Sequence, residues 1–254
     1  ASFEPAIDYV VTKVARFPFD KFAGASNKLG TQMKATGEVM SVGRTIEESL
    51  LKAVRSLEIG VCHVHSPKFD KTPTEELYDY IKDGRDDRLF AVCELLRRGE
   101  RAERINAVTK IDMLFLEKFA HIVDYEKIVA AHKGDQKTLY AAKKTGFSDK
   151  YIAKLWNVEE KDVYALREKY GIFPVYKMID SCSGEFAGYV PYLYSTYEEE
   201  NEAAVENRRK IVVLGSGPIR IGQGVEFDYS TVHAVKTIKE NGYEAIIVNN
   251  NPET

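Results

Sequence analysis

A glycine-rich run, residues 213–229, carries the residue types and the spacing of an anion-binding turn. This segment, VLGSGPIRIGQGVEFDY, follows a short apolar run and contains Gly215, Gly217, Gly222 and Gly224. Glycines after a buried strand let the backbone turn sharply and point N–H groups at a phosphate or another anion. The run therefore predicts either an anion site or a turn whose glycines serve backbone geometry alone.

Two departures from the dinucleotide-binding fingerprint argue against a nicotinamide cofactor at this turn. The third glycine of that fingerprint would stand at position 220, where the sequence has Arg220. An acidic residue at the tip of the next strand would bind the ribose, but the sequence there has Asn249, Asn250 and Asn251. A glycine pattern by itself is in any case weak support for a function.

Cys62, His63 and His65 stand close together in the sequence CHVH and suggest a metal site at first sight. A structural zinc site uses four ligands, usually in two separated pairs, and no second pair follows at a suitable spacing. We therefore expect a loop or strand with two exposed histidines and no metal.

Residues 147–171 have the outline of a helix-turn-helix, with the turn at Asn157 and Val158. The segment carries five basic and five acidic side chains. Each carboxylate would repel the phosphate backbone that a recognition helix must approach. Two helices packed within a bundle therefore explain the pattern better than DNA binding does.

Charge and cysteine usage favour an intracellular globular protein. The net charge of −3 leaves no basic surplus to neutralise the phosphates of a nucleic acid. The three cysteines, Cys62, Cys93 and Cys182, have no paired spacing, which disfavours a disulfide framework and favours a reducing cytoplasm. No apolar run approaches the roughly 18 residues that a membrane helix needs. We expect a cytoplasmic protein that binds neither nucleic acid nor membrane.

The elements that must position these residues form three parts, in an α+β, multidomain arrangement. Strand patterns at 9–14 and 38–42 precede a helix at 45–57, which opens on a capping box of Thr45 and Glu48. Helical periodicity then predicts a central all-α domain, with helices over residues 74–82, 86–98, 111–131, 136–144, 148–156 and 159–170. An irregular tyrosine-rich stretch follows at 173–197.

The last part reads as one parallel βαβ unit, with strands at 210–214 and 243–249 around a helix at 231–241. A two-stranded parallel sheet leaves its faces uncovered, and the sequence opens without methionine on a strand-rich segment. We therefore expect both α/β parts to be partial and both ends of the sequence to be cuts within a longer protein.

Several blocks together resemble the large subunit of carbamoyl phosphate synthetase. These blocks are FEPAIDYVVTKVARFPFDKF, QMKATGEVMSVGRTIEESLLKAVRSLE, PVYKMIDSC, YLYSTYEEE, VLGSGPIRIGQGVEFDYSTVHA and VNNNPET. They are long, follow the order of that family and together span nearly the whole chain, with the helical middle least alike in residues.

The resemblance implies a place for each part within two homologous synthetase halves, each made of a pre-ATP-grasp domain and an ATP-grasp domain. Residues 1–58 would be the C-terminal tail of the first ATP-grasp domain. Residues 59–197 would be the helical oligomerisation domain, and 198–207 a linker. Residues 208–254 would begin the second, Rossmann-like pre-ATP-grasp domain.

The resemblance also implies an activity for the parent protein. That activity is an ATP-dependent ligation that makes carbamoyl phosphate from bicarbonate, ammonia from glutamine and two ATP, for arginine and pyrimidine synthesis. The parent would use ATP, Mg²⁺ or Mn²⁺, and K⁺, and would pair with a glutaminase small subunit. The catalytic residues of the family lie outside this sequence, and Asn249 stands where a metal-binding glutamate would be. The chain itself is therefore expected to be non-catalytic, to bind no cofactor and to self-associate through its helical domain.

By the same resemblance, Gly224, Glu226 and Glu38 would line a tunnel that carries ammonia and carbamate between the sites of the parent. Two other interpretations stay open on the sequence: a free-standing α/β nucleotide-binding protein, and a helix-turn-helix module that binds nucleic acid.

Overall fold

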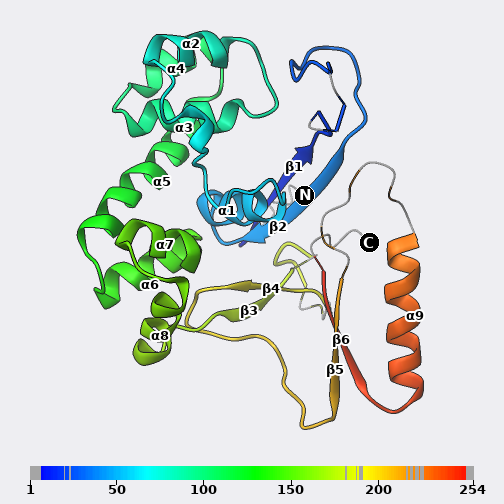
Figure 1. Cartoon of the computed structure of the whole chain (residues 1–254). Coiled ribbons are helices and arrows are strands. Elements are labelled where there is room, and N and C mark those ends of the chain that lie inside the picture. The colour runs from blue at the N-terminus through cyan, green and yellow to red at the C-terminus, as the bar shows by residue number, and fades with distance from the viewer. Residues whose placement is uncertain are drawn as a thin grey trace.

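A small antiparallel sheet and one helix lead into the helical part of the chain (Figure 1). The computed structural model describes residues 7–19, 21–22, 24–180, 182–186, 188, 191–215, 217, 220, 223 and 226–249. β1 (Val10–Arg16) pairs with β2 (Gly37–Gly43), with Val10 opposite Gly43. Both strands confirm the predicted ones, and Val39 of β2 packs in a small core with Ala53 and Leu57.

Helix α1 (Ile46–Ser56) begins where the sequence predicts, but its cap differs from a full capping box. The Thr45 hydroxyl accepts the N–H of Glu48 at 3.2 Å, as expected. The Glu48 carboxylate accepts the N–H of Arg44 at 2.7 Å, one residue before the position that a capping box requires. This half of the prediction is wrong, because the buried Glu48 side chain also pairs with Lys52 one turn later.

Helices from both ends of the helical part pack against one face of a long helix, α5 (Met113–Ala131). Its buried side chains include Leu116, Ile122 and Val129, and Leu51 of α1 belongs to the same core. The other helices are α2 (Thr74–Lys82), α3 (Arg88–Arg97), α4 (Ala102–Thr109), α6 (Gln136–Thr145), α7 (Asp149–Trp156) and α8 (Glu160–Tyr170), after a 3-10 turn at Pro67–Phe69.

Helix α4 is not expected from the sequence, whereas the six predicted helices of this part are confirmed. α4 is short, and Arg101 before it makes no side-chain capping bond. Ile105 is its one buried residue, so the segment shows little apolar periodicity. Its position between α2 and α5 holds it in helical form.

The tyrosine-rich stretch contains a strand pair where the sequence predicts irregular structure. β3 (Val175–Met178) pairs with β4 (Leu193–Thr196), and Val175 lies opposite Thr196. β4 buries Tyr194 and Thr196 and exposes the two residues that alternate with them. Four residues of alternation are too few to separate a strand from a loop by pattern, but contact with β2 stabilises this one.

The last part is a parallel unit of β5 (Lys210–Leu214), α9 (Glu226–Glu240) and β6 (Glu244–Val248). Its register places Lys210 opposite Glu244 and Leu214 opposite Val248, which confirms the predicted βαβ unit. α9 begins five residues before the predicted start at 231, because acidic residues in its first turn favour the positive end of a helix.

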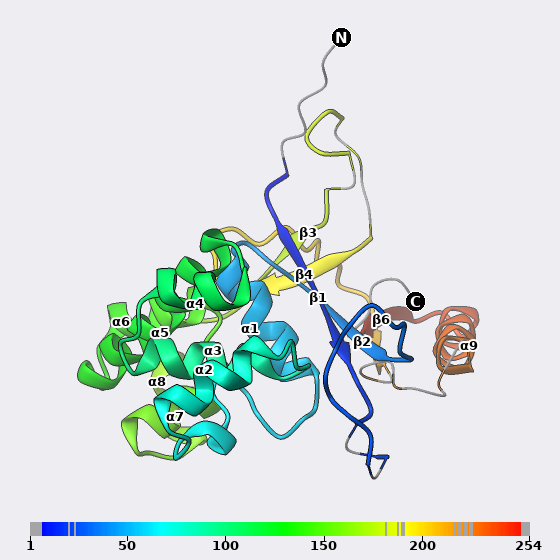
Figure 2. The same ribbon diagram turned by 90° about the horizontal axis from the view of Figure 1, so that it is seen from above.

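The three parts lie in a row. Figures 1 and 2 show α2–α8 on one side of the β1–β2 sheet and α9 with β5 and β6 on the other. This arrangement confirms a central helical domain flanked by partial α/β pieces. Over the described residues, every helix is too short or too polar to span a membrane.

Candidate functional site

The glycine-rich turn is described at Gly215 and Gly217, while Gly222 and Gly224 lie outside the described residues. The Gly215 N–H donates to the carbonyl oxygen of Val248 at 2.8 Å. A Cβ atom on Gly215 would lie 2.7 Å from the side-chain oxygen of Asn249, so the close approach of β5 and β6 requires glycine here. Gly217 has a φ of 81°, the left-handed region that favours glycine.

The carboxylates of the predicted tunnel lie on separate elements. Glu38 is on β2, where its side chain pairs with Lys13 of β1 at 3.1 Å. Glu226 is the first residue of α9 and is exposed. Arg220, which replaces the fingerprint glycine, forms an ion pair with Glu58 just beyond α1. The role of Glu38 and Glu226 in a tunnel stays a prediction.

His63 is buried, so the expectation of two exposed histidines is wrong for this residue. Only 1% of His63 is exposed, and its ring stacks on Tyr151 with centroids 3.7 Å apart. Its Nε2 lies 3.0 Å from a carboxylate oxygen of Glu126. His65 is partly buried and bonds Asp70 and Lys154. Throughout the ranges that the structure describes, no three His, Cys, Asp or Glu side chains gather as a metal site.

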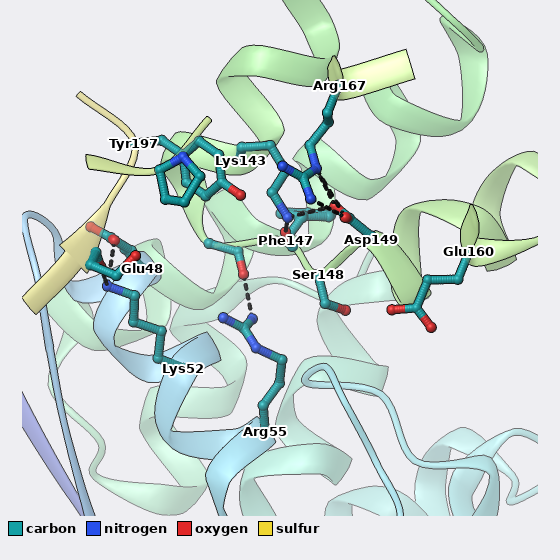
Figure 3. Close-up of a pocket in the computed structure, with 13 residues that line it drawn as sticks. Glu48, Lys52, Arg55, Lys143, Phe147, Ser148, Asp149, Glu160, Arg167 and Tyr197 are labelled. Carbon is teal, nitrogen blue, oxygen red and sulfur yellow. Dashed lines mark hydrogen bonds and ion pairs between the residues drawn. The ribbon is translucent and has the colours of Figure 1, made fainter. Parts of the chain in front are cut away.

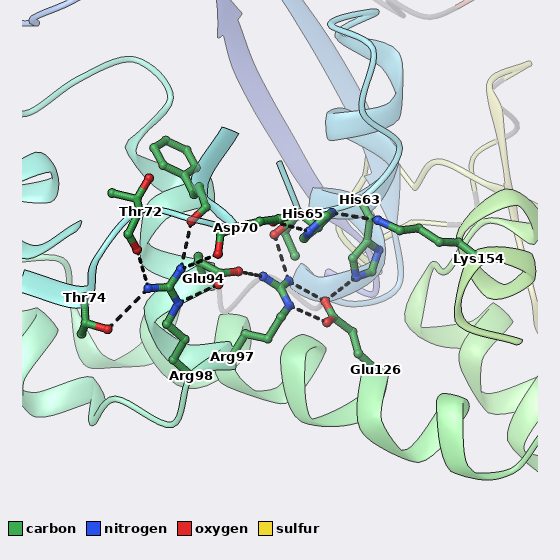
Figure 4. A network of polar contacts seen from close by, with 12 residues as sticks. His63, His65, Asp70, Thr72, Thr74, Glu94, Arg97, Arg98, Glu126 and Lys154 are labelled. Carbon is green, nitrogen blue, oxygen red and sulfur yellow. Dashed lines mark hydrogen bonds and ion pairs between the residues drawn. The ribbon is translucent and has the colours of Figure 1, made fainter. Parts of the chain in front are cut away.

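Arg97 and Glu126 form the centre of the polar network around His63 (Figure 4). Two nitrogens of Arg97 donate to the two oxygens of Glu126, each at 2.8 Å. Burial would raise the pKa of Glu126, but the bonds from Arg97 and His63 outweigh burial and lower it to about 2. Burial lowers the pKa of His63 to about 4 against the opposing effect of Glu126. The network ties α3 and α5 to the segment after α1 and has a structural role.

The segment with a helix-turn-helix outline packs into the helical bundle, as its balanced charge predicts. α7 buries Tyr151, Ile152 and Trp156, and it contacts both α5 and α8. The Trp156 indole N–H donates to the carbonyl oxygen of Val129 on α5 at 2.7 Å. Asn157 ends α7 with a φ of 51°.

A polar cavity of about 400 Å³ lies where α1, the turn between α6 and α7, α8 and the segment of β4 meet (Figure 3). On the α1 side, Lys52 pairs with Glu48 at 2.6 Å. The Lys52 ammonium also donates to the carbonyl oxygens of Val42 on β2 and Ser195 on β4. Burial lowers the pKa of Lys52, and Glu48 opposes this effect. Lys52 therefore connects α1 to both sheets.

On the opposite wall of the cavity, the carboxylate of Asp149 binds two cations. Asp149 accepts two nitrogens of Arg167, the closer at 2.7 Å, and the Lys143 ammonium at 2.7 Å. Burial would raise the pKa of Asp149, but both cations lower it. Burial lowers the pKa of Lys143 to about 8, and the nearby charges of Arg167 and Arg55 act in the same direction. Asp149 therefore neutralises one of the two cations that it binds.

Arg55 lies between these two ion-paired groups in the view of Figure 3. Its Nη1 donates to the carbonyl oxygen of Gly146 at 2.5 Å. Among the described residues, Arg55 makes no direct ion pair with a carboxylate; burial lowers its pKa, and the more distant charges of Glu48 and Asp149 oppose this effect. The guanidinium thus keeps donors available on the cavity side.

A family model described as the oligomerisation domain of the carbamoyl-phosphate synthetase large chain matches residues 38–171. That match covers more than half of the chain. The chain belongs to the carbamoyl-phosphate synthetase large-chain family. A second model, the preATP-grasp domain of carbamoyl phosphate synthase, matches residues 207–254. The two matches confirm the resemblance seen in the sequence.

The sequence of this member of the synthetase family does not predict the cavity. Its charged residues come from segments that lie far apart in the chain, and each residue type is ordinary on a helix surface. The one local sign is the run Gly146, Phe147, Ser148 and Asp149, in which a glycine ends one helix and a capping serine begins the next. That sign predicts a tight turn and says nothing about a cavity.

Proposed function

We propose that the chain is the central part of a carbamoyl phosphate synthetase large subunit. In this role it self-associates through its helical domain and connects the two ATP-using halves of the parent protein. The observation that carries the proposal is that the oligomerisation-domain match falls on a helical unit with its own hydrophobic core. The preATP-grasp match then falls on the βαβ unit that follows.

The parent protein, by this proposal, makes carbamoyl phosphate from bicarbonate, glutamine-derived ammonia and two ATP in the cytoplasm. Its product would enter arginine and pyrimidine synthesis. ATP, Mg²⁺ or Mn²⁺, and K⁺ would bind the parent, together with a glutaminase small subunit. The chain itself is proposed to be non-catalytic, and Asn249 at the position of the family's metal-binding glutamate supports this assignment.

The surface proposed for self-association includes Leu114 and Phe115 in the first turn of α5. They are adjacent large apolar side chains, 51% and 45% exposed, inside the segment that matches the oligomerisation domain. Apolar side chains exposed next to one another are typical of surfaces that bind a partner. Because oligomers are usually symmetric, a second copy of this chain would present the same side chains.

Sedimentation velocity over a wide range of protein concentrations tests this proposal. We expect association of the 254-residue chain that weakens in Leu114→Glu and persists in Lys127→Glu, which changes an exposed charge on the same helix. A chain that stays monomeric at every concentration would refute the proposed self-association. Bicarbonate-dependent ATP hydrolysis by the purified chain would refute the non-catalytic role.

The tunnel is tested in the full-length parent. We expect Gly224→Leu to uncouple bicarbonate-dependent ATP hydrolysis from synthesis of carbamoyl phosphate, because a tunnel must stay open and exclude bulk water. Comparison of the two rates measures the coupling. Unchanged coupling would exclude Gly224 from the tunnel wall.

A further inference from the structure

We propose that the cavity beside Arg55 binds a phosphate group, either as the free ion or carried by a small molecule. The site is made by α1, the turn between α6 and α7, and α8, and it is separate from the glycine-rich turn. The inference does not depend on the self-association or the catalytic role of the chain.

The charge balance of the cavity points to an anion with two negative charges. Its walls contain four cations, which are Lys52, Arg55, Lys143 and Arg167. The carboxylates paired with them are Glu48 and Asp149, so two positive charges are left over. A third carboxylate, Glu160, also lines the cavity but belongs to an exposed residue, so water screens its charge. A dianion such as phosphate would neutralise both surplus positive charges, whereas a carboxylate ligand would leave one of them unneutralised.

Arg55 is the residue with which such an anion would pair. An arginine stays protonated in proteins, and a charge removed from water is normally paired. Arg55 is partly buried, yet it donates its hydrogen bond to a neutral carbonyl, that of Gly146. The remaining N–H groups of a guanidinium form a planar fork that matches two oxygens of a phosphate.

Neighbouring cavity groups offer further donors and enough room. Ser148 accepts the N–H of Tyr151 at 3.1 Å as the cap of α7, so its own hydroxyl hydrogen is available to an anion. Ser148 and Arg55 both line the cavity. The volume of about 400 Å³ lies in the lower part of the roughly 300–1,000 Å³ range of small-molecule sites. The space therefore suits a phosphate or a small phosphate ester.

Calorimetric titration of the chain at constant ionic strength tests the proposal. The probes are sulfate, inorganic phosphate, glycerol 3-phosphate and acetate. We expect saturable binding of sulfate and phosphate and weaker binding of acetate. Tighter binding of glycerol 3-phosphate than of phosphate would identify an ester as the ligand, while equal affinity would identify the free ion. Acetate binding as tightly as sulfate, or no saturable binding of either dianion, would overturn the proposal.

Two further measurements locate the binding. Arg55→Gln should weaken sulfate binding by about tenfold or more, since a hydrogen bond to a charged group is lost. Arg101→Gln, which changes an arginine whose side chain is 80% exposed, should leave the affinity unchanged. Should Arg55→Gln fail to fold, sulfate titration of the wild-type chain by NMR decides the question. The amide signals of Gly146, Phe147 and Ser148 should shift, and signals that shift only elsewhere would overturn the assignment.

Discussion

The backbone of Gly146 lies directly against Glu48 of α1. A Cβ atom at Gly146 would be 2.8 Å from the Glu48 Cα and 3.1 Å from its carbonyl oxygen. Gly146 also has a φ of 99°, which side chains rarely adopt. The contact places the carbonyl oxygen of Gly146 where Arg55 donates to it.

The substitution Gly146→Ala should destabilise the chain by roughly 2–4 kcal/mol, because the new methyl group adds a clash to an unfavourable φ. Urea denaturation followed by the fluorescence of Trp156, the single tryptophan, measures the change. Gly134→Ala is the matched control, since Gly134 has a φ of 78° but a Cβ there would meet no described atom within 4 Å. We expect that variant to lose only about 1 kcal/mol. Equal losses in both variants would show that the contact with Glu48 is not tight.

Acidification should destabilise the chain between pH 6.5 and 4.5 through His63. The folded-state pKa of about 4 lies below the ordinary value of 6.5, so the unfolded chain takes up the proton first as pH falls. The free energy of unfolding should therefore fall by about 2 kcal/mol across this window. Below pH 4.5, the unfolded chain also takes up a proton at Glu126, while the folded carboxylate, with its pKa of about 2, stays ionised; further stability is therefore lost down to about pH 2.

Urea denaturation of His63→Phe at several pH values checks this assignment. The variant lacks the titrating ring, so its stability should vary less between pH 6.5 and 4.5 than that of the wild type. His132→Gln removes an exposed histidine and should keep the full dependence. A His63→Phe profile parallel to the wild type would assign the acid sensitivity to other groups.

The substitution Asp149→Asn should cost about 3 kcal/mol, because Lys143 and Arg167 then lose their shared carboxylate in a buried site. Thermal denaturation measures the loss, and added sulfate should restore part of it by supplying a replacement anion. Asp124→Asn breaks an exposed pair with Lys127 and should change stability by less than about 1 kcal/mol. Failure of sulfate to stabilise Asp149→Asn more than the wild type would contradict the charge argument.

Sulfate affinity should fall as pH rises above about 8, where Lys143 loses its proton. Burial is the main cause of that low pKa; Arg167 on α8 and Arg55 on α1 add to it, and Asp149 on α7 opposes it. Sulfate keeps its two negative charges over this pH range, so a change in affinity must come from a change in the charge of the protein. Loss of one nearby charge should weaken binding roughly five- to tenfold between pH 7 and 9.5. The control is Lys143→Met, whose sulfate affinity, measured by calorimetry, should not change with pH over this range.

The sequence pattern predicts a helix or strand correctly where local preference and tertiary contacts favour the same secondary structure. The capping Thr45 and the apolar period after it place α1 correctly. Ile105 and Tyr194 mark two failures, since α4 and β4 are short and depend on contacts with distant elements. His63 is a third failure, because its burial depends on Glu126 and Tyr151, which lie far along the chain.

The cavity could not be predicted because its charge surplus exists only after folding. Lys52 and Glu48 are one turn apart and resemble an ordinary helix-surface pair. Their burial comes from β4, whose Ser195 carbonyl accepts from Lys52 across a separation of 143 residues. The sequence gives the charged residues, but it does not show which of them become buried in the same cavity.

The bond from Lys52 to Ser195 shows that the chain, after forming the helices that follow α1, returns to the β2–α1 region at β4. Arg220, in the glycine-rich turn of the last part, pairs with Glu58 just beyond α1, so that part also returns to this region. The helical domain is thus a closed loop in space, with both of its ends at one place. Residues gained or lost inside that loop would change the size of the helical domain while leaving the spacing between the flanking parts as it is.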